Sequence, residues 1–139
     1  MRRLLALIAA LALLVPATAG LAARGTATVY RGRTEGRAVV IVKVRAGRVT
    51  SFKASVYASC GSSNLLIAVA YPPSGRRGAS VAIRNGAFRA TYQSDPALDP
   101  EDDRRTIAGR VGRGGRLTGT IRVRGLCSAD EAWSARRAG

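Results

Sequence analysis

Two consecutive stretches of alternating residues decide the fold: residues 37–45, with sequence RAVVIVKVR, and residues 48–60, with sequence RVTSFKASVYASC. Over much of each stretch, every second residue is apolar and lies between polar or charged neighbours. A period of two is typical of a strand that is buried on one face. Because Ala46-Gly47 stands between them, the two stretches predict an antiparallel hairpin.

The same pattern continues toward the C-terminus. Residues 64–71 form a short apolar run, and Asn85-Gly86, the strongest short hairpin signal, separates two further alternating segments. Residues 107–111 and 117–123 alternate on either side of a glycine-rich turn. A glycine interrupts the apolar face of each of these two strands, which indicates a close approach of backbones or a sharp bend.

These strands predict the fold class. We expect an all-β protein, an antiparallel β-sandwich or a flattened β-barrel, of about seven to nine short strands. After the N-terminal apolar run, the only helical pattern is a turn or so within residues 130–136.

The N-terminus has the pattern of a secretory signal peptide. Arg2 and Arg3 precede an unbroken apolar run over residues 4–15, and Pro16 and the small residues 17–19 follow it. As a helix the run would extend about 18 Å, which is too short for a bilayer core of about 30 Å. We expect a signal peptide over residues 1–19, with cleavage after Ala22 or Ala23 as alternatives. The prediction is then a single secreted or extracytoplasmic β domain over residues 20–139, with no transmembrane segment in the mature chain.

The chain has two cysteines, Cys60 and Cys127. An even number of cysteines in an exported protein indicates a disulfide, here one bridge that closes a long loop. A metal site is the weaker interpretation, because the chain has no histidine and no Cys-x-x-Cys motif.

Short motifs spread along the chain resemble a group of small exported single-disulfide β proteins from GC-rich bacteria. The resemblance covers most of residues 25–137 and implies the same exported β fold and the same disulfide. That group has no assigned activity, so the resemblance implies no chemistry. The motif residues are Tyr30, Gly32, Thr34, Gly36, Cys60, Ile107, Gly109, Gly119, Ile121, Cys127 and Trp133-Ser134-Ala135.

The absence of histidine excludes most familiar catalytic arrangements. It removes the usual general base near neutral pH, the Ser/His/acid and Cys/His arrangements, and most zinc sites. Glu35, Asp130 and Glu131 could still form a carboxylate pair for a hydrolase, although their spacing singles out no pair. We therefore expect a protein that is not an enzyme and that needs no cofactor.

Five of the eight acidic residues lie close together in one Pro-containing segment. The main interpretation is a solvated loop whose charge offsets the neighbouring Arg104 and Arg105. We expect no metal site, and the weaker alternative is a calcium ion, since clustered carboxylates suit that ion. Its candidate ligands are Asp95, Asp99, Glu101, Asp102 and Asp103.

A large basic excess is the remaining functional signal, with 23 Lys and Arg against 8 Asp and Glu and a formal net charge of +15. Arginines on the outer face of a hairpin could attract anionic polymers or an envelope surface. The alternative is a charged solvent face that keeps the sheet from aggregating. The candidate polyanion contacts are Arg110, Arg113, Arg116, Arg122 and Arg124.

The leading functional hypothesis is therefore a non-enzymatic exported or envelope-associated β domain that adsorbs non-specifically to anionic surfaces. The first alternative is a specific ligand- or protein-binding module, such as an inhibitor-like protein that presents Tyr71-Pro72-Pro73 or the acidic loop. The second alternative is an unrecognised carboxylate-dependent hydrolase.

Overall fold

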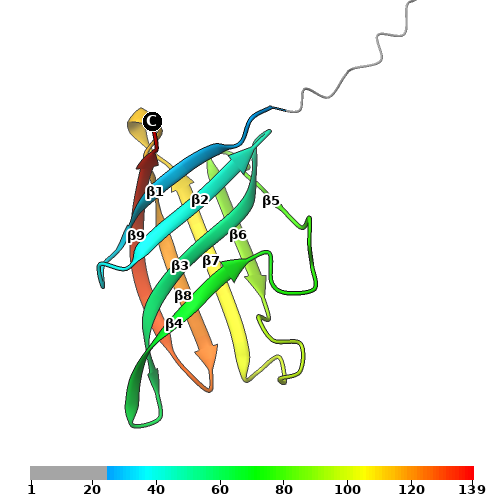
Figure 1. Cartoon of the computed structure of the whole chain (residues 1–139), viewed down its shortest axis with the longest axis vertical. Helices are drawn as coiled ribbons and strands as arrows, with labels where there is room; N and C mark the ends of the chain where they lie inside the picture. The colour runs from blue at the N-terminus through cyan, green and yellow to red at the C-terminus, as the bar shows by residue number, and fades with distance from the viewer. Residues whose placement is uncertain (1–24) are drawn as a thin grey trace, which may run out of the picture.

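The structure is a computed structural model that describes residues 25–139, and the predicted signal peptide therefore lies outside the described residues. Its nine strands form one antiparallel sheet in the order β4-β3-β2-β1-β9-β8-β7-β6, with β5 paired to β3 (Figure 1). The strands are β1 (Thr28–Thr34), β2 (Val39–Arg45), β3 (Arg48–Cys60), β4 (Ser63–Tyr71), β5 (Val81–Ala82), β6 (Ala87–Tyr92), β7 (Asp103–Val111), β8 (Leu117–Gly125) and β9 (Ala129–Arg137).

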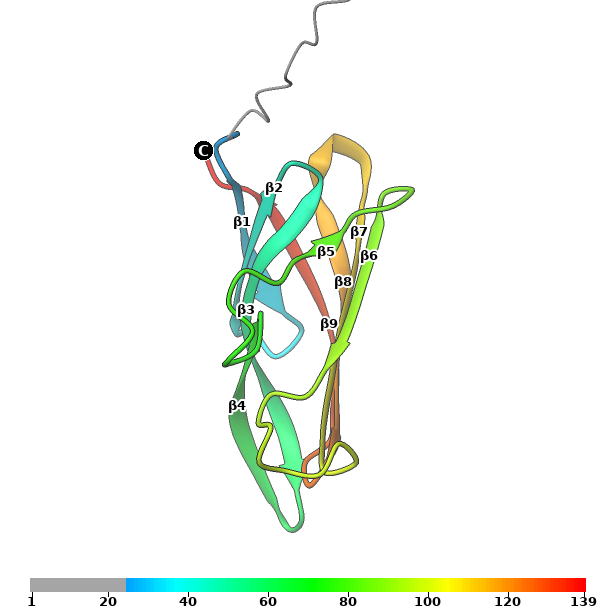
Figure 2. The same ribbon diagram turned by 90° about the vertical axis from the view of Figure 1, so that its right-hand side faces the viewer.

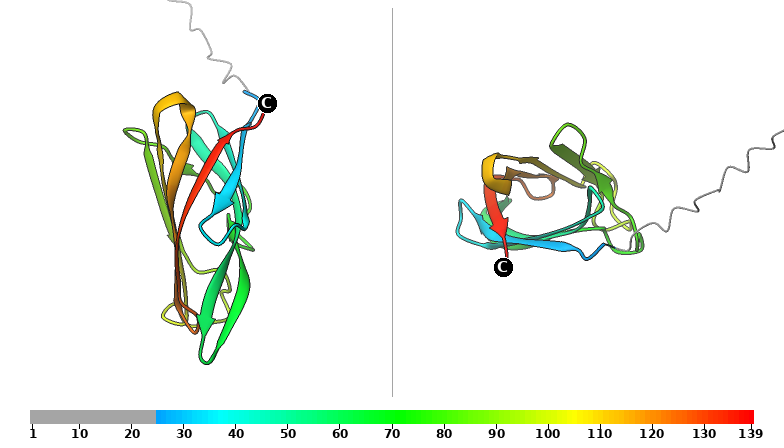
Figure 3. Two further views of the ribbon diagram at one scale, coloured as in Figure 1. Left: turned by 90° about the vertical axis from the view of Figure 1, so that its left-hand side faces the viewer. Right: turned by 90° about the horizontal axis from the view of Figure 1, so that it is seen from above.

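The sheet curls into a half-barrel. Strands β1–β4 form one wall and β6–β9 form the other, with the core between them (Figure 2). Seen from above, the two walls join where β1 pairs with β9 (Figure 3). The predicted all-β antiparallel class is thus confirmed, in a form closer to the flattened barrel than to two separate sheets.

The core is formed by the apolar residues that the predicted alternation puts on one face of each strand. Val40, Val42, Phe52 and Val56 are fully buried, and the charged residues between them point outward. The rings of Phe52 and Trp133 meet edge to face, with 5.3 Å between their centroids. Burying each large apolar side chain stabilises the fold by about 1.5–3 kcal/mol, so this interior accounts for much of the stability.

The two predicted tight turns are present. Asn85 and Gly86 have φ values of 50° and 72°, and Ala46 and Gly47 have φ values of 48° and 68°. Two successive positive φ values are what a two-residue turn of the type I′ class requires. The hairpin predictions at both positions are therefore confirmed.

The helical turn considered within residues 130–136 is wrong. Those residues belong to β9, which pairs with β1 on one side and β8 on the other. Ala129, Trp133 and Ala135 are buried in the core. The partners on both sides satisfy the backbone of this segment, and this tertiary context outweighs its local helical pattern.

The disulfide joins the two halves of the chain. Cys60 at the end of β3 is bonded to Cys127 in the turn between β8 and β9, and their Cα atoms lie 4.2 Å apart. The neighbouring Ser59 and Ser128 exchange two backbone hydrogen bonds of 2.8 Å each. The predicted single bridge is confirmed.

The half-barrel remains open between β4 and β6. Across this gap, the Arg105 guanidinium on β7 donates a hydrogen bond to the carbonyl oxygen of Ala68 on β4. Its Nε atom also donates to Asp103 Oδ1 at 3.1 Å. One side chain therefore connects the two walls where no backbone ladder does.

Candidate functional site

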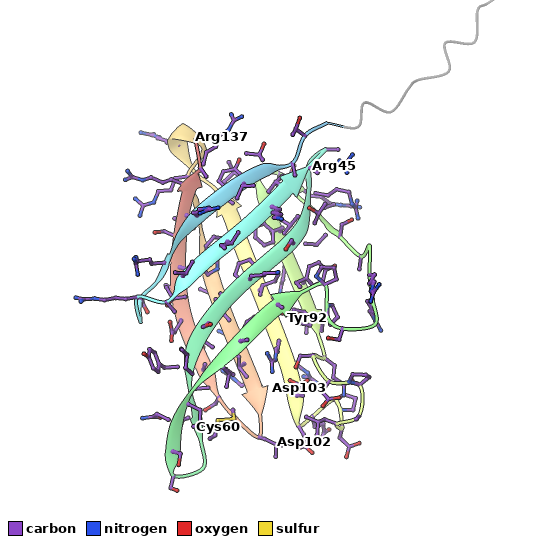
Figure 4. The ribbon with its side chains drawn as sticks, in the orientation of Figure 1. Arg45, Cys60, Tyr92, Asp102, Asp103 and Arg137 are labelled. Atoms are coloured by element: carbon purple, nitrogen blue, oxygen red, sulfur yellow. A yellow bond between two sulfur atoms is a disulfide. The ribbon has the colours of Figure 1, made fainter. Side chains whose placement is uncertain are left out.

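The strand directions leave one end of the described part of the molecule with basic residues and no acidic ones. Figure 4 shows Arg45 and Arg137 at one end and Asp102, Asp103 and Cys60 at the other. All eight acidic residues lie in loops or strand starts away from the first end: Glu35, Asp95, Asp99, Glu101, Asp102, Asp103, Asp130 and Glu131.

The first end carries arginines on or beside each of its turns. They lie at the β2–β3, β5–β6 and β7–β8 connections and at the end of β9. The β7–β8 connection includes the only helical turn of the described residues, Arg113–Gly115. We call this set the arginine rim; it consists of Arg45, Arg48, Arg84, Arg110, Arg113, Arg116 and Arg137.

The arginine rim has no internal charge compensation. Within residues 25–139, the arginines that form ion pairs are Arg105, Arg122 and Arg124, and none of them belongs to the rim. Cationic groups gathered without acids produce a positive potential that attracts anions over distances of about a Debye length, roughly 8–10 Å.

A groove runs from the rim along the free edge of β6. Two adjoining hollows of about 500 and 300 Å³ share Ser80, Val81 and Arg89. Four arginines line this edge groove: Arg48 and Arg84 in the first hollow, Arg76 in the second, and Arg89 in both.

One groove arginine is held in place by hydrogen bonds. Arg48 donates from Nε to Ser80 Oγ at 2.7 Å and from Nη2 to the Ser80 carbonyl oxygen at 3.1 Å. Because these acceptors are neutral, they fix the guanidinium without cancelling its charge. The Arg48 guanidinium is therefore fixed at the groove with its charge uncompensated by these acceptors.

The backbone of β6 adds hydrogen-bond donors to the same groove. Ala87 exchanges backbone hydrogen bonds with Arg84, on the side away from β7. Since backbone groups alternate in direction along an antiparallel strand, Arg89 and Thr91 also direct their N–H groups away from β7. The groove thus combines guanidinium groups with strand-edge N–H groups, and both kinds of donor bind carboxylate and phosphate oxygens.

The five predicted polyanion contacts lie in two different places on the structure. Arg110, Arg113 and Arg116 belong to the arginine rim, and Arg110 also lines an outer hollow of about 430 Å³ that borders the edge groove at Arg89. Arg122 and Arg124 lie on the same outer face but nearer the other end, where both contact Asp130 at 3.1 and 3.0 Å. Hydrogen bonds from Arg124 and Arg122 lower the pKa of the Asp130 carboxyl, so this group stays ionised and offsets their charge.

The five acidic residues of the predicted loop lie in different environments, because Asp99, Glu101 and Asp102 line one hollow whereas Asp103 is hydrogen-bonded inside the loop. Asp103 is buried and accepts hydrogen bonds from Ser94 N–H, Ser94 Oγ and Asp95 N–H at 2.6–2.7 Å. Burial alone would raise the pKa of Asp103, but these bonds and Arg105 outweigh it and lower the pKa. Among the described residues, no three His, Cys, Asp or Glu side chains are placed to hold a metal ion.

The predicted hydrolase carboxylates bind the backbone instead of facing a common hollow. Glu131 accepts the N–H of Tyr57 at 2.8 Å and that of Gly36 at 3.3 Å, and Glu35 accepts the N–H of Ala132 at 3.4 Å. Asp130 is paired with two arginines. Each of the three carboxylates thus has a structural role.

The tripeptide Tyr71-Pro72-Pro73 is not an exposed tip. Tyr71 and Pro72 are half-buried and Pro73 is buried. Tyr71 packs against Tyr92, with 5.4 Å between the ring centroids. Desolvation by burial raises the pKa of Tyr92, so its hydroxyl stays protonated.

Sequence reasoning missed the groove arginines at positions 76, 84 and 89 and did not recognise the rim. A signal for the rim was present, because in an up-and-down sheet every second turn lies at the same end. Arg45 and Arg48 flank one such turn, and Arg113 and Arg116 lie in another. The signal for the groove was absent, since it requires knowing that β6 is an edge strand.

Comparisons with known proteins give no identification: no protein-family model, no curated protein and no solved structure matches the chain. Among the described residues, no helix is long and apolar enough to cross a membrane.

Proposed function

We propose that this protein is a non-enzymatic binding domain whose arginine rim and edge groove hold the negatively charged groups of an extended anionic polymer. One observation carries the proposal: seven arginines gather at one end of the half-barrel, while all eight acids lie elsewhere. A GC-rich genome would account for the choice of arginine over lysine, but not for the absence of acids at this end of the half-barrel.

The same geometry favours charge recognition over sequence recognition. The rim consists of arginines from several turns. The aromatic residues that line the edge groove, Phe88, Tyr71 and Tyr92, are buried or half-buried, so they offer little open ring surface on which a base could stack. Contacts of this kind release counterions, so the affinity falls steeply with salt and depends little on the sequence of the polymer.

We also propose that the protein works outside the cytoplasm. The Cys60–Cys127 disulfide is of the kind that persists in oxidising compartments, and the pattern of residues 1–19 is typical of a signal peptide. The resemblance of the motifs to a group of exported β proteins fits this location and adds no activity.

Two double variants on one hairpin test the proposed site. Arg113→Ser with Arg116→Ser removes two charges from the rim, and Arg122→Ser with Arg124→Ser removes two charges near the other end. Binding to a fluorescein-labelled DNA duplex, used as a model polyanion, is followed by anisotropy over a range of salt concentrations. Thermal melting of both variants confirms that they are folded.

The rim variant should bind more weakly, and the slope of log K against log salt should become shallower by about 1.8, because about 0.9 is lost with each phosphate contact. The control variant should change the slope much less, since Asp130 already offsets its arginines. Equal losses in the two variants would contradict a rim site, and so would the absence of binding at low salt.

A further inference from the structure

The lower half of β4 is an open edge of the sheet, and its hairpin with β3 extends beyond the rest of the molecule (Figure 2). Ser59 directs its backbone N–H and C=O groups to Ser128, so its neighbours on β3, Ala58 and Cys60, direct theirs to β4. Their partners on β4 are Leu65 and Ser63. Asn64 and Leu66 therefore direct their N–H and C=O groups away from the sheet.

This edge lacks the features that usually prevent an edge strand from pairing with a strand of another molecule. Residues 54–75 contain no charged residue, in a chain that has 31 of them, and β4 itself contains no proline. Leu65 and Leu66 are 50% and 55% exposed on opposite faces of the strand. Proteins usually place lysine, proline or a bulge at such an edge, because an uncharged apolar edge pairs with another strand. Only the carbonyl of Ala68, higher on β4, is occupied, by Arg105.

The charge distribution indicates which strand fits this edge. An acidic or basic partner segment finds no complementary charge on residues 54–75. A second copy of the chain offers an uncharged, apolar strand with its own open edge, and an antiparallel strand pair is complementary to itself under a two-fold rotation. The hairpin also lies at the end opposite the arginine rim (Figure 4), so two copies that meet there keep their rims far apart.

We infer that two copies of the protein pair through β4, antiparallel, about a two-fold axis at Leu65. In this register Asn64 of each copy lies opposite Leu66 of the other, and their outward N–H and C=O groups bond to one another. Leu65 faces Leu65 of the second copy as a non-hydrogen-bonded pair. The result is a continuous sheet across both molecules. Because the paired segment is short, the dimer is weak and depends on concentration.

Cysteine cross-linking tests the register. The oxidised protein has no free cysteine among its described residues, so one added cysteine per copy reports on the contact. The Cα atoms of a non-hydrogen-bonded pair lie about 4.5 Å apart, a distance that a disulfide spans. Leu65→Cys should therefore form a disulfide-linked dimer on mild oxidation, and Leu66→Cys should do so far less. Equal cross-linking of both variants would overturn the proposed register.

Sedimentation velocity over a hundredfold range of concentration tests the association itself. Asn64→Pro removes an outward N–H that β3 does not use, and its ring blocks the approach of a second strand, so this variant should stay monomeric. Leu66→Lys should weaken the dimer about tenfold or more. Tyr57→Lys is the matched control, because Tyr57 lies opposite Leu66 on β3 and is 56% exposed; this variant should still dimerise.

Three results would overturn the inference. The first is a wild-type protein that stays monomeric at every concentration, and the second is a dimer that Asn64→Pro leaves unchanged. The third is a series of ever larger assemblies, which would indicate head-to-tail pairing of β4 with β6 in place of a closed two-fold contact. Melting curves of the variants ensure that a monomer is a folded one.

Discussion

The indole ring of Trp133 lies over Gly119, its partner on the neighbouring strand, where any side chain would collide with it. A Cβ atom at Gly119 would collide with the backbone oxygen of Ala108 on β7 and lie 2.8 Å from ring atom Cε2, and one at Gly109 would lie 2.5 Å from the Phe88 ring and 2.9 Å from ring atom Cζ2. Phe88 packs beside Trp133, with 6.3 Å between the ring centroids. The two glycines thus make room for the aromatic core.

Replacing Gly119 by alanine should therefore destabilise the protein. The added methyl group forces the indole ring or the β7 backbone to shift, and overpacking of this kind costs about 1–3 kcal/mol. Urea unfolding measures the loss. Gly112→Ala is the milder control, because its Cβ would lie 3.3 Å from a single carbonyl oxygen of Arg116. Similar stabilities for the two variants would show that both the β7 backbone and the indole ring have room to move.

Removal of the disulfide should lower stability substantially. Cys60 and Cys127 close a loop with a sequence separation of 67 residues, which on the chain-entropy model corresponds to about 4 kcal/mol. Cys60→Ser with Cys127→Ser should accordingly melt several degrees below the wild type, as measured by calorimetry. Two free thiols titrated in the native wild-type protein would refute the bridge.

The stability should depend on pH through Asp103. Its folded pKa lies below the ordinary value, so its contribution is fully present above the pKa of the unfolded chain, about 3.9. The contribution is lost as the pH falls through the lower folded value. Asp103→Asn should cost about 3 kcal/mol at neutral pH and show a weaker decline in acid. Parallel pH profiles for the wild type and the variant would disprove this assignment.

Glu131 should stabilise the fold more through the hydrogen bonds that it accepts than through its charge. Its carboxylate, on β9, accepts the backbone N–H of Tyr57 on β3 and that of Gly36 in the β1–β2 turn. Glu131→Ala should lower the free energy of unfolding by about 1–3 kcal/mol. Glu131→Gln keeps one acceptor oxygen and should lose less. Equal losses for the two variants would mean that the charge itself stabilises this junction.

Cleavage of the predicted signal peptide can be tested directly. Mass spectrometry of the protein recovered from the extracytoplasmic fraction should give a mature chain that begins at Gly20. A recovered product that retains the apolar residues 4–15 would contradict cleavage at this position.

The sequence predicted the fold class well because burial on one face imposes a period of two. The alternation around Val40, Val42 and Phe52 and the turn at Asn85-Gly86 are local signals, and each corresponds to a strand or turn of the structure. The segment 130–136 was ambiguous, because its local pattern does not reveal that it lies between two partner strands.

The candidate site was less predictable, because it depends on which strands end side by side. Arg110, Arg113 and Arg116 are near one another in the chain, whereas Arg84 joins them through the pairing of β6 with β7, and Arg48 through the pairing of β3 with β5. Arg122 and Arg124 are separated from the rim because β8 runs away from it and places them beside Asp130 on β9. No local pattern specifies that β9 is the neighbour of β8.

The pairing of β1 with β9 brings Tyr30 opposite Arg137, so the first and last strands of the domain complete the sheet together. On the ribosome, therefore, the second edge of β1 has no partner until β9 has been made. Trp133, the centre of the aromatic core, arrives at the same late moment. We therefore expect the domain to fold only once β9 is present, and a chain cut short before Ala129, with an open β1 edge and no Trp133, should lack a stable fold.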